Sequence, residues 1–187
     1  YAALCIMLVP TLILWIVGGA WVSCNSARNL PQLVRFAEQG YAVAAIEYRL
    51  AHEARFPAQI EDAKTALRFL RANADKYGID GSRVGVWGHS AGGQLAALLG
   101  VTGGSPEFET ADDLQQSTRV QAVVEFSGPI DIELDFRREF HMPVMAQMFG
   151  GTIQMKPQLA RSTNPVHYLD GREVPPFLIM HGDADTT

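Results

Sequence analysis

The sequence predicts an α/β fold, a three-layer α/β/α sandwich whose central sheet is mostly parallel. Three observations predict it. Short apolar runs typical of buried strands alternate with helical patterns along the chain. A Gly-x-Ser-x-Gly segment joins one of these runs directly to a helical pattern, as in a tight strand-to-helix turn. The composition is that of one globular core, so we expect a single domain over residues 1–187.

The composition also excludes several classes of protein. Of the 187 residues, 48% are apolar and 19% are charged, which is too apolar and too weakly charged for a disordered chain. The net charge is −5 and the arginines are scattered, so nucleic acid is not expected as a partner. Cys5 and Cys24 are too few for a disulfide scaffold, and no paired Cys/His spacing indicates a zinc site.

Residues 1–20 form an uncharged apolar run, which suits a membrane span, a signal peptide or a buried strand. Its length suits a membrane span or the apolar core of a signal peptide. However, no basic segment precedes the run, Pro10 interrupts it, and Gly18 and Gly19 follow its most apolar part. Buried parallel strands are also continuous apolar runs. The context of the whole chain therefore favours a strand over residues 11–17, with no integral membrane association.

The remaining elements follow from periodicity and from stop signals. Residues 57–77 carry apolar side chains at helical spacing and end before Gly78. Residues 130–164 show no clear period and are longer than a crossover requires, so we expect an irregular lid or insertion there. The expected strands are residues 11–17, 41–48, 83–87, 120–126 and 176–181, and the expected helices are residues 29–39, 57–77 and 92–99.

Residues 88–92 read Gly-His-Ser-Ala-Gly, and their context is that of a nucleophile elbow. An apolar strand leads straight into the segment, and an apolar helix leads straight out of it. So tight a turn requires small residues two positions before and after the serine, where Gly88 and Gly92 stand. The turn would expose the Ser90 hydroxyl and aim the N–H of Ala91 at a developing oxyanion. The alternative is a glycine-rich turn in which Ser90 only caps the helix.

Two further parts of an acyl-transfer site have candidates. Residues 17–21 follow the strand of the preceding unit, and their glycines would let backbone N–H groups approach a substrate carbonyl. A plain glycine turn is the alternative.

Strand 176–181 ends in a polar turn, where the carboxylate that orients the base is expected. Asp185 is the candidate acid and Asp183 is favoured as a turn residue, although both could simply shape the turn.

The general base has no clear candidate. In this fold the base follows the acid in the chain, and every histidine of this sequence precedes Asp185. His89 belongs to the elbow and is expected to face away from the serine. The sequence thus predicts that the base lies beyond Thr187. The five histidines are His52, His89, His141, His167 and His181.

These segments resemble the α/β-hydrolase superfamily, and more narrowly the bacterial esterases related to feruloyl and acetylxylan esterases and to hormone-sensitive-lipase-like carboxylesterases. The resemblance spans most of the chain and includes ILWIVGGAW, SRVGVWGHSAGGQLAALLG and PPFLIMHGDAD. It implies Ser90 as nucleophile, Asp185 as triad acid, and oxyanion N–H groups from Ala91 and from Gly19 or Ala20.

The resemblance also implies the order of the strands across the sheet. That order is 41–48, 11–17, 83–87, 120–126, 176–181, the contiguous middle of the family's larger sheet. We therefore expect a domain that is truncated at both ends. One departure concerns the oxyanion loop, because Val17 stands where this family usually has a histidine, and the anchoring of the loop is then open.

The expected activity is hydrolysis of a small or carbohydrate-linked acyl ester through an acyl-enzyme. A peptidase or arylformamidase on the same fold, or an inactive fragment without the catalytic histidine, are the alternatives. No metal or cofactor is expected, because His52-Glu53 lacks the second histidine of H-E-x-x-H and no nucleotide-binding motif occurs. The compartment stays open between cytoplasmic and secreted.

The acyl pocket would draw on apolar side chains of the insertion. Packing in the core is an equally good explanation of the same residues. They are Phe136, Phe140, Met142, Met145, Met148 and Phe149.

Overall fold

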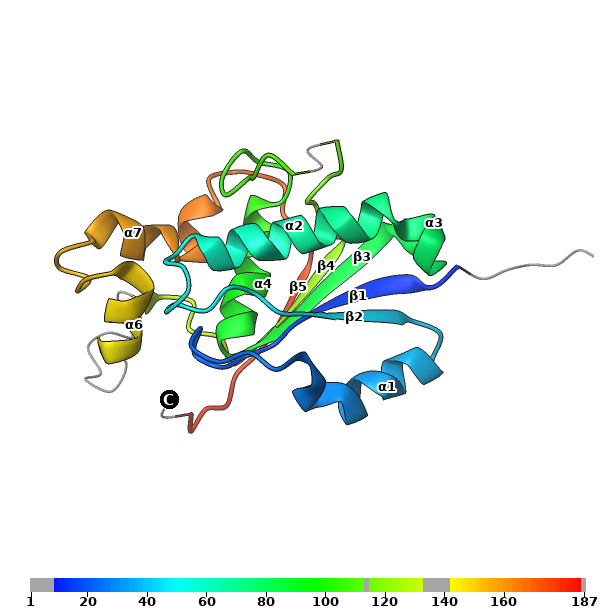
Figure 1. Ribbon diagram of the computed structural model, residues 1–187, viewed down its shortest axis with the longest axis horizontal. Helices are drawn as coiled ribbons and strands as arrows, with labels where there is room; N and C mark the ends of the chain where they lie inside the picture. The colour runs from blue at the N-terminus through cyan, green and yellow to red at the C-terminus, as the bar shows by residue number, and fades with distance from the viewer. Residues whose placement is uncertain (1–8, 113–114, 133–141, 186–187) are drawn as a thin grey trace, which may run out of the picture.

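The computed structural model describes residues 9–112, 115–132 and 142–185, which form a parallel sheet between two layers of helices (Figure 1). The order of the strands is β2-β1-β3-β4-β5, and every neighbouring pair is parallel. This is the α/β/α fold that the sequence predicts, with the strand order that the resemblance to the α/β-hydrolases implies. The strands are β1 (Thr11–Ile16), β2 (Ala42–Ile46), β3 (Asp80–His89), β4 (Ala122–Phe126) and β5 (Phe177–Met180).

Strand β1 confirms the strand that the sequence predicts over residues 11–17. It pairs with β2 on one side and with β3 on the other, so both of its edges are hydrogen-bonded. Leu12, Leu14 and Ile16 are buried toward one face of the sheet, and Trp15 is buried toward the other. A central strand covered on both faces requires this continuous apolar sequence. Among the described residues, no helix combines the length and apolarity needed to cross a bilayer.

Helices cover the two faces of the sheet unequally. Helix α1 (Leu30–Glu38) lies on one face, where Phe36 stacks edge-on against Trp87 of β3 at 5.1 Å between ring centroids. Helices α2 (Ala58–Ala72) and α4 (Ala91–Thr102) lie on the other face, and α3 (Ala74–Tyr77) continues α2. The hydrophobic core lies between the sheet and these two long helices, with Leu67 and Leu98 fully buried.

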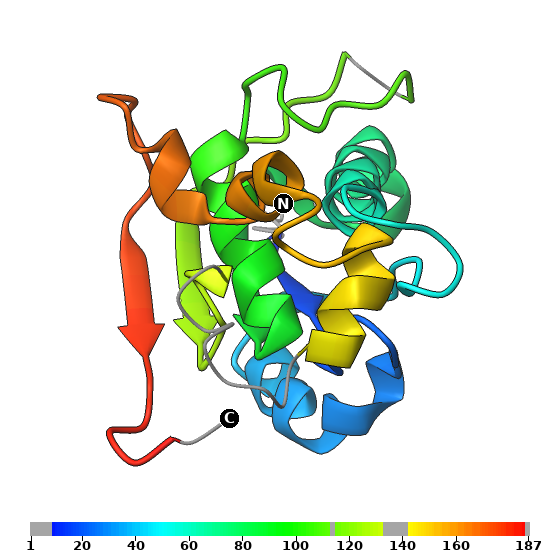
Figure 2. The ribbon, with the colours of Figure 1, turned by 90° about the vertical axis from the view of Figure 1, so that its left-hand side faces the viewer.

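The segment after β4 differs from its expected irregularity. Helices α6 (Met142–Phe149) and α7 (Pro157–Ser162) form there and lie at the end of the sheet where the strands finish (Figures 1 and 2). Pro143 and Pro157 stand in the first turns of these helices, where the missing N–H breaks no hydrogen bond. Two 3₁₀ helices complete the described elements, η1 (Ser26–Asn29) and η3 (Pro165–Tyr168).

Two smaller corrections concern element boundaries. The expected helix 57–77 is divided at Asn73 into α2 and α3, and Asn73 donates a side-chain hydrogen bond back to the carbonyl of Phe69. Strand β3 begins at Asp80, three residues before its expected start at 83. The reason is a backbone hydrogen bond, which the amide of Asp80 donates to the carbonyl of Pro10.

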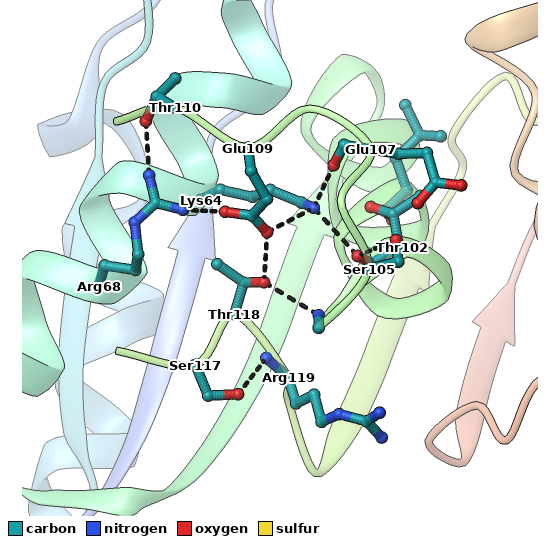
Figure 3. A network of polar contacts seen from close by, with 12 residues as sticks. Lys64, Arg68, Thr102, Ser105, Glu107, Glu109, Thr110, Ser117, Thr118 and Arg119 are labelled. Atoms are coloured by element: carbon teal, nitrogen blue, oxygen red, sulfur yellow. Dashed lines mark hydrogen bonds and ion pairs between the residues drawn. The ribbon is translucent and has the colours of Figure 1, made fainter. Parts of the chain in front are cut away.

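A buried polar network fixes the loop between α4 and β4 to the surface of α2 (Figure 3). Lys64 and Arg68 of α2 are almost completely buried, and both bond the carboxylate of Glu109. The Lys64 ammonium also donates to the carbonyls of Thr102, at 3.0 Å, and of Glu107, at 2.5 Å. Each buried cation is thereby surrounded by acceptors, which offsets its loss of hydration.

Candidate active site

The predicted elbow forms a sharp turn between β3 and α4. Ser90 adopts φ 56° and ψ −125°, a strained backbone conformation for a residue with a side chain. Its amide donates to the carbonyl of Phe126 at 2.8 Å, and its carbonyl accepts from the amide of Gln94 at 3.1 Å. Ser90 stands at the N-cap position of α4, yet its hydroxyl makes no capping hydrogen bond. The explanation of this serine as a simple helix cap therefore loses its main support.

The glycines around the serine are required by packing. A Cβ added to Gly88 would lie 2.0 Å from the carbonyl oxygen of Gly92, and one added to Gly92 would lie 2.0 Å from that of Ile16. Strand β3, helix α4 and the end of β1 therefore approach one another through bare backbone. Helix α4 begins at Ala91, directly after Ser90, so its N-terminus lies at this turn.

The loop that follows β1 packs against the elbow. A Cβ added to Gly18 would lie 2.5 Å from the carbonyl oxygen of His89 and 3.0 Å from the Cβ of Ser90. The next two residues, Gly19 and Ala20, have φ values of 144° and 51°. Their amides donate to no carbonyl among the described residues. The loop is thus packed against the elbow at Gly18, while the positive φ of Gly19 and Ala20 shapes the turn that follows.

Three hydrogen bonds anchor this loop without a histidine at position 17. The hydroxyl of Tyr48 donates to the carbonyl of Val17 at 3.0 Å, and the indole N–H of Trp21 donates to the Gln94 side chain at 3.3 Å. The amide of Ala51 donates to the carbonyl of Trp21 at 2.8 Å. Burial raises the pKa of the Tyr48 phenol, which therefore stays protonated and remains a donor.

Tyr48 and Gln94 hold the loop of the candidate site and were not predicted from the sequence. Gln94 is fully buried in the first turns of an otherwise apolar helix, and its amide also donates to the carbonyl of Thr163 at 2.7 Å. A lone glutamine in an apolar helix is a signal that could have marked it. Tyr48 carries no such signal, since its partner is a backbone carbonyl of a distant segment.

Asp185 follows β5 at the same end of the sheet as the elbow. Its carboxylate lies 3.5 Å from Nε2 of His181 and is close enough to His89 to favour the protonated imidazole. Burial, with a contribution from Arg28, nevertheless lowers the pKa of His89 overall. The structure therefore brings Asp185 toward the elbow, where the sequence predicts the triad acid.

Nε2 of His181 lies 3.5 Å from the Asp185 carboxylate, and His89 is part of the elbow itself. His52 lies exposed on the loop after β2, and His167 lies in η3. His141 lies outside the described residues. Within the described ranges, no three His, Cys, Asp or Glu side chains form a group that could hold a metal ion.

The apolar residues of the insertion that the structure describes belong to the core. Met145, Met148 and Phe149 are buried in the main hydrophobic cluster. Phe136, Phe140 and the side chain of Met142 lie outside the described residues. For the three buried residues, packing is thus the observed role.

The sequence profile of the BD-FAE family matches residues 8–187. Esterase LipC of Mycobacterium tuberculosis (strain ATCC 25618 / H37Rv) is 37% identical over 180 residues, which are 94% of this chain and 44% of LipC. The chain therefore spans less than half the length of this relative.

Solved structures of esterases have the same fold over nearly the whole chain. A truncated form of a carbohydrate esterase from gut microbiota is 32% identical with a TM-score of 0.82, and the match covers 96% of this chain and 68% of that one. Thermogutta terrifontis esterase 2, phosphonylated by sarin, is 26% identical with a TM-score of 0.80, and the match covers 96% of this chain and 64% of that one.

Proposed function

Because this chain belongs to the BD-FAE family of α/β-hydrolase esterases, we propose that it carries the nucleophile, oxyanion and acid parts of a serine carboxylic-ester hydrolase. The observation that carries the proposal is the strained turn at Ser90, against which the Gly18–Gly19 loop is packed. Strain of this kind persists where surrounding structure holds it, and it concentrates at functional sites.

The reaction begins with attack of the Ser90 oxygen on the acyl carbon of the ester. A base takes the hydroxyl proton, and the new C–O bond converts the carbonyl into a tetrahedral oxyanion. The amides of Ala91 and of Gly19 or Ala20 donate to that oxyanion. Collapse of the intermediate breaks the bond to the alcohol, which leaves with the proton. Water then attacks the acyl-enzyme by the same steps and releases the acid.

The base in this scheme is a histidine oriented by Asp185. Since all five histidines precede Asp185 and the chain spans 44% of LipC, we propose that the base belongs to a part of the native-length protein outside these 187 residues. The chain of 187 residues by itself is then nearly inactive. The present pairing of Asp185 with His181 is consistent with an acid whose catalytic partner is elsewhere.

We propose a small or carbohydrate-linked acyl ester as the substrate. The support is the likeness to a carbohydrate esterase from gut microbiota, at 32% identity. A small acyl group also fits an insertion whose described apolar side chains, Met145, Met148 and Phe149, are packed in the core. A peptidase or arylformamidase would use the same elbow and is separated from an esterase by its substrate.

Hydrolysis of 4-nitrophenyl acetate and of an acetylated xylo-oligosaccharide tests the proposal. Three proteins are compared: this chain, the native-length protein, and the native-length Ser90→Ala variant. We expect activity in the second protein alone, on both esters. Equal turnover in the native-length protein and its Ser90→Ala variant would sink the proposal, and activity on an anilide or N-formyl amide alone would favour the alternative.

A fluorophosphonate provides a second test at the level of the nucleophile. The related Thermogutta terrifontis esterase 2 is phosphonylated by sarin. We expect a single adduct on Ser90, found by peptide mass spectrometry of the native-length protein. A matched control is Ser162→Ala, since that hydroxyl donates to a helix carbonyl in α7 and should leave labelling unchanged.

A further inference from the structure

A carboxyl group that the hydrolytic scheme leaves unused lies buried beside the elbow. Glu125 of β4 is fully buried, at the level of Gly88 in β3 and of Ile179 in β5. One of its carboxyl oxygens, Oε1, accepts a hydrogen bond from the amide of Gly128. The other, Oε2, has no hydrogen-bond partner in the described part of the chain. A buried acid with an unpaired oxygen is costly, so its retention calls for an explanation.

The carboxyl group lies against the first turn of α4. A Cβ added to Gly93 would lie 2.9 Å from Oε1 of Glu125, and one added to Gly128 would lie 2.6 Å from the same atom. Helix α4 itself carries no charged residue between Ala91 and Thr102. The first turn of α4 contains no acidic residue of its own. Glu125 of β4 therefore supplies an acceptor oxygen at the N-terminus of this helix.

The hydrogen bond from Gly128 to Glu125 closes a turn over residues 125–128. This turn contacts both the elbow that carries Ser90 and the end of β5. Within this turn, the carbonyl of Phe126 accepts from the amide of Ser90 at 2.8 Å. The amide of Ser127 donates to the carbonyl of Met180 at 2.8 Å, at the end of β5. Ser127 has φ 50°, so the turn is strained and needs an external contact to hold it.

We propose that Glu125 is a positioning residue for the nucleophile. By closing the 125–128 turn, its carboxyl group fixes the Phe126 carbonyl against the Ser90 amide. The same turn fixes the end of β5, from which the segment carrying Asp185 continues. Glu125 thus sets the distance between nucleophile and acid without touching the substrate. This inference rests on the proposed function of Ser90 and Asp185.

The test uses the native-length protein and three variants, Glu125→Ala, Glu125→Gln and Glu109→Ala. Alanine removes the acceptor of the Gly128 hydrogen bond, whereas glutamine keeps a carbonyl oxygen in its place. We expect Glu125→Ala to lower kcat about tenfold to a hundredfold with little change in KM, because small displacements of reacting groups have effects of this size. Glu125→Gln should restore most of kcat.

Glu109→Ala is the matched control for lost stability. Glu109 is a partly buried acid whose contacts include Lys64, and Lys64 bonds Thr102 at the far end of α4 from Ser90. We expect the Glu109 variant to keep kcat per folded molecule at a temperature well below its Tm. A drop in kcat equal to that of Glu125→Ala would show that general loosening, and not the position of Ser90, explains the effect.

Hydrogen exchange separates failure of this inference from failure of the proposed function. In Glu125→Ala we expect amide exchange to rise more over residues 87–94 and 126–129 than over the rest of the sheet, whereas in Glu109→Ala the rise over these residues is no larger than elsewhere in the core. This readout needs no turnover, so it decides the role of Glu125 even if Ser90→Ala shows that Ser90 is not the nucleophile. Exchange that rises no more over residues 87–94 than over the rest of the sheet, or an unchanged kcat in Glu125→Ala, overturns the inference.

Discussion

The carboxylate of Asp185 lies 3.5 Å from Nε2 of His181, the residue four positions before it. This pair stands at the end of β5, on the side of the sheet where the elbow presents Ser90. A carboxylate in this place is suited to orient an imidazole and to stabilise its charge. Because of this pairing, we expect substitution of Asp185, rather than of Asp183 in the same turn, to lower the rate of ester hydrolysis.

We predict that Asp185→Asn in the native-length protein lowers kcat by about 10³–10⁴-fold, because the amide no longer stabilises the imidazolium or selects its tautomer. Steady-state kinetics on 4-nitrophenyl acetate measures this change. Asp183→Asn in the same polar turn is the control and should stay within about threefold of the parent. Similar losses in both variants would assign the effect to the turn as a whole.

Gly92→Ala should destabilise the fold. The added Cβ would lie 2.0 Å from the Ile16 carbonyl oxygen, and neither backbone segment can move without separating β1 from α4. We expect a loss of about 3 kcal/mol or more in the free energy of unfolding, measured by urea denaturation. Gly85→Ala in β3 meets only the Ala122 carbonyl at 3.8 Å and should be neutral or slightly stabilising.

Tyr48→Phe should loosen the oxyanion loop. The variant removes the hydrogen bond to the Val17 carbonyl and leaves that buried acceptor unpaired, which costs about 1–3 kcal/mol. A fall in kcat that exceeds any rise in KM is expected, since the loop acts on the transition state. Tyr41→Phe, at an exposed tyrosine just before β2, should change neither quantity.

Glu109→Ala should lower stability without lowering turnover. The substitution leaves the charges of Lys64 and Arg68 buried without their shared carboxylate, at a cost of about 3–5 kcal/mol. Thermal unfolding measures the change. Glu61→Ala removes an exposed ion pair with Arg49 and should cost less than about 1 kcal/mol. Equal shifts in Tm would contradict a special role for the buried network.

Glu125 should make the fold less stable as the pH rises. Burial raises the pKa of its carboxyl group, although the Gly128 amide and the field of His181 oppose this. Above the pKa of the unfolded chain, near 4.5, the unfolded state loses this proton more readily than the folded state. Stability therefore falls with pH until the folded pKa is passed.

Urea unfolding of the parent and of Glu125→Gln between pH 4 and pH 8 tests this sign. The variant should gain stability relative to the parent as the pH rises, because its amide does not ionise. A difference between the two proteins that stays constant across the range would show that Glu125 has the same protonation in both states.

The strands were predictable because each is a short apolar run bounded by glycine, proline or polar turns. The order of the strands followed from the resemblance to the α/β-hydrolases, and the structure confirms it. Helices α6 and α7 are too short to give residues 130–164 a clear helical period, and Pro143 and Pro157 stand near their starts. Proline alone does not distinguish a helix start from a loop.

The site was predictable where its requirements are local. Gly88, Ser90 and Gly92 are demanded by one turn, so they appear as one motif. The Tyr48 hydroxyl bonds the distant Val17 carbonyl, and the turn that begins at Glu125 reaches Ser90 through the Phe126 carbonyl, so no sequence motif predicts either contact. Their contributions depend on how strands that are distant in sequence pair in the sheet.

Four residues without glycine's freedom, Ala20, Trp21, Ser90 and Ser127, hold positive φ around the elbow. Each such residue stores about 1 kcal/mol or more in its backbone. Selection for thermostability alone would therefore favour glycine or asparagine at Ala20 and Ser127. Such variants would unfold at a higher temperature and, under the proposed mechanism, turn over more slowly, so directed evolution of this scaffold should screen thermal stability and ester hydrolysis together.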